Sequence, residues 1–443
     1  MKRFLSILLA ILMLAVMLPV TAMAEENYVM ISGIKGVENE KYASFEAAYN
    51  AIKPKLEALC KSDALGQGGT TAEEFDALFT DRDENGNATL TYTISGNITY
   101  DESTLNNLLT FGRRASHYGN DRHLINFKFV GATGRDSDTL TVNSDITLPY
   151  EWWGEKTTTS ISFENLTITG TAPNGLYPTQ KFFEGINFKV DNCKLEGIKI
   201  YNCSNVGGSY TITNNIFDGT NAPQNAYAIH LQGNETAPLT INISNNTISG
   251  YDRGINIDQK TAAATISNNN ISVKDAGRSC IQLTQLASTK VENNTMKLTG
   301  GNAITLHEEL LNCAKPEITV SGNAINGSGY LIYDDSNGAF TNENLNLTIT
   351  KDNTVAKTVD TTQGVKDRET HPLSEIVKTT VENNVVPGGS TGGTIVIVPD
   401  RTEDTPKTDD QKNPATGAND LVAVAVAAAA LALAGSAIIL RKD

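Results

Sequence analysis

The chain has few cysteines and few basic residues. Its 443 residues include only five cysteines, and none of them forms a C-x-x-C pair. An odd number of isolated cysteines suits neither a disulfide framework nor a zinc site, so we expect buried packing residues. Lys and Arg number 35 against 50 Asp and Glu, and no basic block interrupts this acidity. The composition therefore argues against a nucleic-acid partner, which would require clustered positive charge.

Apolar runs long enough to insert into a membrane occur only at the two ends. Residues 1–24 begin with basic residues, continue as an apolar run and end in a small-x-small site at 22–24. This order predicts a signal peptide that is removed on export. Residues 421–440 carry no charge and precede a basic tail at 441–443. They predict a membrane span whose tail stays in the cytoplasm.

An NPATG pentapeptide precedes this C-terminal span. The order of pentapeptide, span and basic tail resembles the sorting signal of Gram-positive surface proteins, whose pentapeptide is Leu-Pro-x-Thr-Gly. Pro414, Thr416 and Gly417 match that pattern, whereas Asn413 replaces the leucine and leaves the sortase class open. The resemblance implies that a sortase cleaves after Thr416 and joins it to peptidoglycan. The membrane would then hold the chain only through the C-terminal span, before sorting.

A repeated segment dominates the middle of the chain, where no helical period appears. Copies such as INISNNTISG align on an asparagine that lies between two apolar columns. The first column holds Phe163, Val190, Ile212, Ile243, Ile266, Val291 and Val320. The second holds Ile168, Leu195, Phe217, Ile248, Ile271, Met296 and Ile325. The spacing varies from 22 residues (Val190 to Ile212) to 31 (Ile212 to Ile243), which indicates a solenoid with insertions in its loops.

A second motif recurs in step with the first. It reads GIKI at 197, AIHL at 228, GINI at 254, CIQL at 280, AITL at 303 and YLIY at 330. Each repeat therefore contains at least two short alternating strands, joined by turns rich in Asn, Gly and Asp. Such strands bury their apolar side only when coils stack, at about 4.8 Å per strand. The repeat predicts an all-β fold, a parallel β-helix.

The aligned asparagines are interpreted as turn residues. They are Asn165, Asn192, Asn214, Asn245, Asn268 and Asn293, and Gly322 interrupts the column. Asparagine tolerates a left-handed backbone and can hydrogen-bond along the stack. In the second motif Cys280 aligns with Gly197, Ala228, Gly254 and Ala303, which indicates a small packed side chain.

With these motifs the chain resembles the right-handed β-helix proteins of the pectate-lyase-like superfamily. In that superfamily an N-terminal helix covers the open end of the coil. Ser44 can cap such a helix, with Phe45, Tyr49 and Ile52 on one face. The predicted order is signal peptide 1–24, N-terminal helical cap region 25–87, right-handed β-helix 88–355, C-terminal cap segment 356–384, disordered wall-spanning linker 385–412 and sorting signal 413–443.

One stretch suggests a metal ion. Asp81, Asp83 and Asn85 of DRDENGN have the spacing of the first half of a calcium-binding loop. Tyr92 stands where such a loop needs a bidentate glutamate, so a polar turn is the alternative. Calcium is the one cofactor that the sequence suggests.

Ligand binding is expected from the outward positions of the second motif, because its isoleucines point inward. One predicted outward column is Lys199, His230, Asn256, Gln282 and Thr305, and the next is Tyr201, Gln232, Asp258, Thr284, His307 and Asp334. Asp252 and Arg253 lie in the adjoining turn. Such a polar strip suits hydroxyl-rich ligands such as glycans. A solvated strand face is the alternative.

The catalytic motifs of the superfamily are incomplete. Its polygalacturonases use clustered Asp residues with Gly-His-Gly and Arg-x-Lys, and neither motif is present. Its pectate lyases use calcium carboxylates and a basic residue, which Arg253 beside Asp252 and Asp258 imitates in part. His307 and Glu308 lie two coils further on, about 10 Å away. With Asp258 they would give an acid and base pair of the kind that glycosidases use.

The sequence thus predicts a secreted, wall-anchored protein on the surface of a Gram-positive bacterium. Its β-helix would bind polysaccharide or a host or cell-surface glycan, as an adhesin does. The alternatives are a polysaccharide lyase or glycoside hydrolase acting on an acidic polysaccharide such as pectin, and a structural stalk.

Overall fold

The computed structural model describes residues 27–59, 77–84, 86–100, 125–144, 146–147, 158–171, 176–177, 186–203, 208–233, 238–385 and 388. The predicted signal peptide, sorting signal and almost all of the predicted linker lie outside these residues. Within the described ranges, no helix is long and apolar enough to cross a membrane.

Among the described residues, the first face of the coil is a sheet of twelve strands. Two strands, β1 (Tyr28–Ser32) and β2 (Lys41–Tyr42), pair antiparallel at its edge. The parallel strands are β3 (Ala88–Ser95), β5 (Ile125–Gly131), β8 (Thr158–Glu164), β11 (Ile186–Asp191), β14 (Gly208–Thr213), β17 (Leu239–Ser244), β20 (Ala262–Ser267), β23 (Ser288–Glu292), β25 (Glu317–Ser321) and β27 (Asn346–Ile349).

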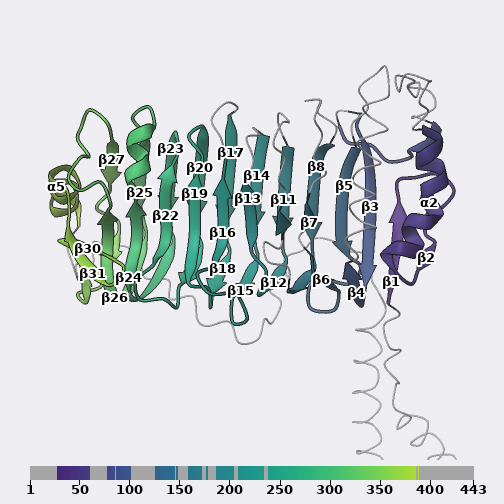
Figure 1. Ribbon diagram of the computed structural model, residues 1–443, viewed down its shortest axis with the longest axis horizontal. Helices are drawn as coiled ribbons and strands as arrows, with labels where there is room; N and C mark the ends of the chain where they lie inside the picture. Colours follow the sequence, from purple (N-terminus) through teal and green to yellow (C-terminus); the bar gives the residue numbers. More distant parts are fainter. Residues whose placement is uncertain are drawn as a thin grey trace, which may run out of the picture. The chain divides into compact units, whose positions relative to one another are not determined.

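In the part of the chain that the structure describes, the second and third faces together form a sheet of seventeen strands. The second face holds β4 (Asn97–Tyr100), β6 (Thr139–Val142), β9 (Thr167–Gly170), β12 (Lys194–Glu196), β15 (Ile216–Asp218), β18 (Thr247–Ser249), β21 (Asn270–Ser272), the first halves of β24 (Thr295–Leu306) and β26 (Ala324–Asp334), and β28 (Thr354–Val355). The third face holds β7 (Ile146–Thr147), β10 (Leu176–Tyr177), β13 (Ile200–Cys203), β16 (Tyr227–Gln232), β19 (Arg253–Asp258), β22 (Ser279–Gln285), the second halves of β24 and β26, and β29 (Val359–Asp360). The chain is therefore a parallel β-helix, as predicted (Figure 1).

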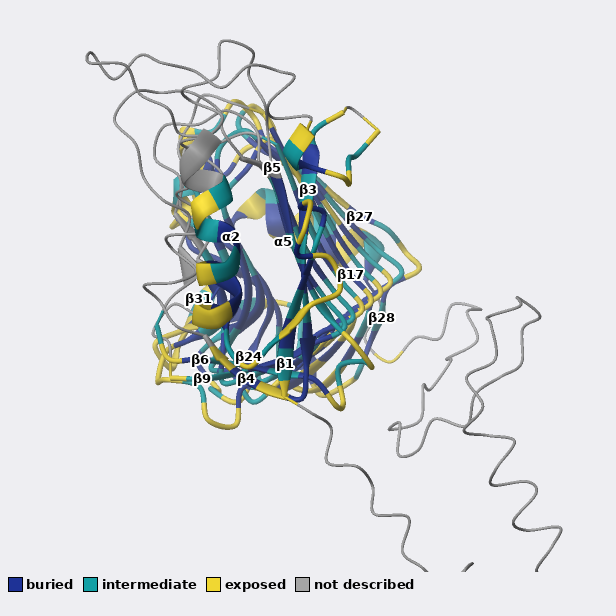
Figure 2. Cartoon of the chain, turned by 90° about the vertical axis from the view of Figure 1, so that its right-hand side faces the viewer, coloured by how far each residue is buried: buried dark blue, intermediate teal, exposed yellow. Residues whose placement is uncertain are grey.

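The strand register confirms both predicted apolar columns. Ile243 pairs with Ile212 on one side and Ile266 on the other, and Ile248 lies between Phe217 and Ile271. All fourteen side chains named for the two columns are at most 2% exposed. Buried residues line the inside of the coil while exposed ones lie at its corners (Figure 2). Removal of these stacked side chains from water stabilises the coil.

The predicted asparagine turns are also confirmed. Asn245, for example, has a φ of 58°, and Gly322 takes the same left-handed conformation with a φ of 64°. The second asparagine of each doubled pair has a different role. Asn246 is buried; its Nδ2 donates to Asn269 Oδ1 at 2.9 Å and its Oδ1 accepts from Asn215. The resulting amide ladder runs through Asn215, Asn246, Asn269, Asn294, Asn323 and Asn353.

Cys280 packs where the prediction placed it, in the column of Gly254 and Ala303. Its side chain is fully buried as a free thiol. A Cβ at Gly254 would lie 2.1 Å from the carbonyl oxygen of Cys280, so the close approach of these strands requires glycine. Cys193 is likewise buried and free, whereas Cys313 is half-buried.

Helices cover the two ends of the coil. At the N-terminal end, α2 (Phe45–Leu59) begins after Ser44, whose Oγ accepts from Ala47 N at 3.1 Å. Phe45 packs on the rings of Tyr92 and Phe129, as a cap requires. At the other end, α5 (Glu375–Asn384) buries two valines, 377 and 381. The hairpin of β30 (Gln363–Lys366) and β31 (Glu369–Pro372) contacts β26, and the 3-10 helix η1 (Glu308–Asn312) contacts β22.

Candidate functional site

The third face carries the predicted ligand-binding strip, but its first strand has a different register. Tyr201 lies beside His230, where the motif alignment had placed Lys199. β12 ends at Glu196 and Gly197 turns the chain with a φ of 70°, so the strand begins later than GIKI suggests. The observed row is Tyr201, His230, Asn256, Gln282, Thr305 and Tyr333.

A second shift occurs around Asp258. Gln232 lies beside Asp258 as predicted. On the other side Asp258 lies beside Gln285 and not beside Thr284, because the register slips by one residue after Ile257. A slip of this kind cannot be read from alternation, since the inward isoleucines stay aligned.

Asp334 was predicted to face outward and instead supports the backbone. It pairs with Leu306 and is 4% exposed. Its two carboxylate oxygens accept hydrogen bonds from the backbone N–H groups of Ser336 and Ser374, both at 2.9 Å. Asp334 therefore does not contribute to a ligand surface.

Three rings pack together on the third face. The His230 ring centre lies 5.0 Å from that of Tyr201 and 4.8 Å from that of Tyr227. Lys199 Nζ lies 5.4 Å from the Tyr201 ring centre. Burial, with the nearby charges of Lys199 and Arg253, lowers the pKa of His230 to about 4. The imidazole is therefore neutral at pH 7 and behaves as part of an aromatic surface.

Arg253 contacts Tyr227 and not the adjacent Asp252. Its Nη1 donates to Tyr227 Oη at 2.9 Å, and the guanidinium carbon lies 4.9 Å from the ring centre. Asp252 accepts from Asn225 N at 2.5 Å and lies 3.5 Å from Lys274 Nζ. The joint arrangement that the sequence suggested for Arg253 and Asp252 is not formed.

Beyond the three rings, neutral polar side chains are joined to one another by hydrogen bonds. Tyr227 Oη donates to Gln282 Oε1 at 3.0 Å, and Gln282 Nε2 donates to Thr284 Oγ1 at 3.0 Å. Thr284 in turn donates to Asn256 Oδ1 at 2.8 Å. Asn256 is 3% exposed, so it orients Thr284 and has little surface for a ligand.

A groove of about 150 Å³ runs along these strands. Its lining comes from β16, β19, β22, β24 and β26, and from β30 of the hairpin. These five strands are stacked along the coil axis at about 4.8 Å per strand. Its lining includes Tyr227, Arg253, Arg278, Gln282, Thr305 and Lys366.

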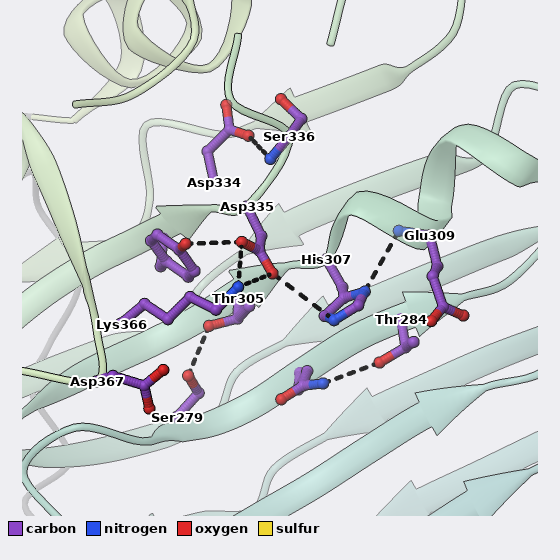
Figure 3. A network of polar contacts seen from close by, with 12 residues as sticks. Ser279, Thr284, Thr305, His307, Glu309, Asp334, Asp335, Ser336, Lys366 and Asp367 are labelled. Atoms are coloured by element: carbon purple, nitrogen blue, oxygen red, sulfur yellow. Dashed lines mark hydrogen bonds and ion pairs between the residues drawn. The ribbon is translucent and has the colours of Figure 1, made fainter. Parts of the chain in front are cut away.

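A buried carboxylate marks the end of the groove beside the hairpin (Figure 3). Asp335 is 4% exposed and accepts from Tyr333 Oη at 2.7 Å and from Lys366 Nζ at 2.8 Å. His307 Nε2 lies 3.6 Å from its other oxygen. Burial and the bond to Asp335 raise the pKa of Tyr333, so this phenol is a neutral donor and not a base. Asp335 thus organises three side chains at one end of the groove.

His307 and Glu308, the predicted partners of Asp258, are directed elsewhere, and Glu309 is the acid whose charge acts on Asp258. His307 Nδ1 accepts the backbone N–H of Glu309 at 3.3 Å, so its Nε2 side faces Asp335 and not Asp258. Glu308 is exposed at the start of η1. Burial first, and then the charge of Glu309, raise the pKa of Asp258 to about 6. Glu309, and not Glu308, is the acid that acts on Asp258.

The predicted calcium loop forms a hydrogen-bonded turn. Asp83 Oδ1 accepts from Asn87 N at 2.9 Å, and its Oδ2 accepts the side-chain amides of Asn87 and Asn126, both at 2.8 Å. Asn85 lies outside the described residues, and Asp81 joins no acid cluster. Among the residues that the structure describes, no three acidic, histidine or cysteine side chains are grouped to hold a metal ion.

Sequence reasoning missed several groove residues, among them Tyr227, Arg278, Asp335 and Lys366. Tyr227 lies one position before the AIHL copy of the second motif, and Arg278 lies two positions before the CIQL copy. Both are therefore outside the stretches in which alternation predicts outward side chains. Asp335 follows the last copy of the motif. Lys366 reaches the groove from a hairpin about 30 residues further along the chain, and no repeat pattern indicates that return.

Comparison with known proteins supports the fold. A family model described as right handed beta helix region matches residues 176–366, an interval that contains the whole groove. No curated protein and no solved structure matches the chain.

Proposed function

We propose that this protein is exported, joined to the cell wall by a sortase, and binds polysaccharide through the third face of its β-helix. The observation that carries the proposal is the Tyr201, His230 and Tyr227 cluster, which continues into the groove. Aromatic side chains offer apolar faces beside polar tips, which suits the mixed surface of a sugar ring. The NPATG motif and the C-terminal apolar segment support wall attachment.

The groove also suits a long ligand. Its hydrogen-bonding side chains come from successive strands at about 4.8 Å intervals, with Tyr227 on β16, Arg253 on β19 and Gln282 on β22. A polysaccharide lying along the coil axis would meet one such group at each step. Each contact contributes about 1 kcal/mol, so binding would be distributed over the groove.

A glycan array with the full-length protein in mild detergent tests this function. We expect binding to a defined set of polysaccharides and about a fivefold loss of affinity for Tyr201→Ala, with a similar loss for Tyr227→Ala. Thr240→Ala, an exposed change on the first face, is the matched control and should bind as the parent does. If no glycan binds, or if the double tyrosine variant binds unchanged while it still folds, the coil is a structural stalk.

A second candidate function is hydrolysis or lyase cleavage of an acidic polysaccharide. The observation in its favour is the carboxyl of Asp258, whose pKa burial and Glu309 raise to about 6. Glycosidases use two carboxyl groups whose surroundings separate their pKa values. Reducing-end and unsaturated-uronate assays on every bound glycan decide the matter. Turnover that Asp258→Asn and Glu309→Gln each abolish would establish an enzyme.

A further inference from the structure

Within the part of the chain that the structure describes, Arg253 lines the groove without an anionic partner. The side chain is half-buried, its Nε is fully covered, and that atom has no hydrogen-bond partner among the described residues. Among the described residues, its Nη1 bonds to the phenol of Tyr227. Within the described ranges, no carboxylate lies within ion-pair distance of this guanidinium. A partly desolvated cation without an acid costs free energy, which a bound anion would recover.

The other two cations of the groove are already neutralised. Arg278 lies 3.6 Å from Asp275 and 3.4 Å from Asp367. Lys366 binds Asp335 at 2.8 Å. With Arg253 included, three cations and three carboxylates balance, and Arg253 is the cation that these ion pairs leave over. A ligand with several negative charges would therefore find a counter-charge in the groove for one of them.

The side chains around Arg253 suit a ligand that has one anionic group followed by uncharged sugar units. His230 beside it is an uncharged imidazole, because burial and the two nearby cations lower its pKa to about 4. Beyond Tyr227 the groove continues with the uncharged side chains of Gln282 and Thr305. The whole chain carries a formal net charge of −15, which adds long-range repulsion of polyanions.

We propose that the groove selects a largely neutral glycan that carries a single anionic group, and that Arg253 is the residue that recognises this group. The inference rests on the proposed glycan binding and names the class of glycan. Carboxylate and sulfate ester share the required chemistry, because both offer oxygen acceptors to a guanidinium. A polyuronate is expected to bind less tightly, because the described groove residues offer its further charges no unpaired cation.

Affinity measurements with four probes test the proposal on the full-length protein. The first is a neutral oligosaccharide bearing one glucuronic acid, and the second is its carboxyl-reduced form. The third bears one sulfate ester in place of the acid, and the fourth is polygalacturonate. We expect the parent protein to bind the better of the two singly charged probes about 10- to 100-fold more tightly than the reduced form, the range for a charged hydrogen bond.

The variants separate charge recognition from folding. Arg253→Gln should abolish the preference for the charged probe over the reduced probe, whereas Arg253→Lys should retain part of that preference. Arg135→Gln is the matched control, since Arg135 donates to the carbonyl of Asn214 and does not line the groove. Melting curves establish that each variant folds.

Three outcomes would overturn the inference. Equal binding of charged and reduced probes by the parent protein refutes anion recognition and leaves glycan binding intact. Tighter binding of polygalacturonate than of both singly charged probes refutes the single-charge preference. Failure of all four probes to bind counts against both this inference and the proposed function.

Discussion

Asn302 and Val365 exchange two hydrogen bonds across 63 positions of sequence. Asn302 Nδ2 donates to the Val365 carbonyl at 2.7 Å, and Val365 N donates to Asn302 Oδ1 at 2.9 Å. Because Asn302 is 1% exposed, water cannot replace these bonds. The pair fastens the hairpin to β24, so that Lys366 reaches Asp335 at the end of the groove.

Replacement of Asn302 tests this fastening. Asn302→Ala leaves two buried backbone groups of Val365 unpaired, so the free energy of unfolding should fall by about 2 kcal/mol. Urea titration measures the loss. Asn326→Ala, an exposed change on β26, is the control and should stay within about 0.5 kcal/mol of the parent. Equal effects at the two positions would show that the reciprocal bonds contribute little.

The two asparagines of one doubled pair should respond differently to substitution. Asn246→Ala removes a member of the buried amide ladder and leaves neighbouring amides unpaired, so we expect a loss of about 3 kcal/mol. Asn245 is exposed and has a φ of 58°, a conformation that glycine adopts freely. Asn245→Gly should therefore be nearly neutral, whereas Asn245→Ala should cost about 1 kcal/mol. Chemical denaturation of the three variants measures the difference.

The stability contributed by Asp258 should depend on pH. Its pKa is about 6 in the fold, against roughly 3.9 for an unfolded chain. Between these values the folded state keeps a proton that the unfolded state has released. The contribution therefore favours folding at low pH and is lost as the pH rises through 6. Asp258→Asn should remove this pH-dependent loss of folding stability, which we expect to be roughly 1 kcal/mol after solvent screening.

His230 should give the opposite slope. Its pKa is about 4 in the fold, against roughly 6.5 unfolded, so acidification protonates the unfolded chain first. Stability is then lost as the pH falls from about 6.5 towards 4. His230→Gln should be less sensitive to acid than the parent. Urea titrations at pH 4.5, 5.5 and 7 compare both variants, and parallel pH profiles for all proteins would contradict both assignments.

Wall attachment is tested at the NPATG motif. Thr416→Ala removes the residue that a sortase would join to peptidoglycan, so the protein should stay in the membrane fraction. The parent and the spacer control Thr405→Ala should appear in the lysozyme-released wall fraction. If Thr416→Ala is also released with the wall, attachment does not proceed through this threonine.

Alternation and repeat spacing alone determined the parallel β-helix and its inward columns. Ile243 aligns with Ile212 and Ile266 in sequence and in space, because stacked coils bury like positions together. The left-handed turn at Asn245 followed from the same alignment. These features depend on local conformation and on neighbouring copies of one motif, which the sequence displays directly.

Only the tertiary structure decided the composition of the groove. Tyr201 lies beside His230 because of the residue at which β13 starts. A shift of two residues leaves the same side chains pointing outward, so alternation cannot reveal it. Arg253 bonds to Tyr227 on the adjacent strand and not to Asp252, its neighbour in sequence, because outward side chains contact residues on adjacent strands. Lys366 reaches Asp335 only because a distant hairpin folds back onto the coil. Contacts between segments far apart in sequence leave no periodic trace, so they require the folded chain.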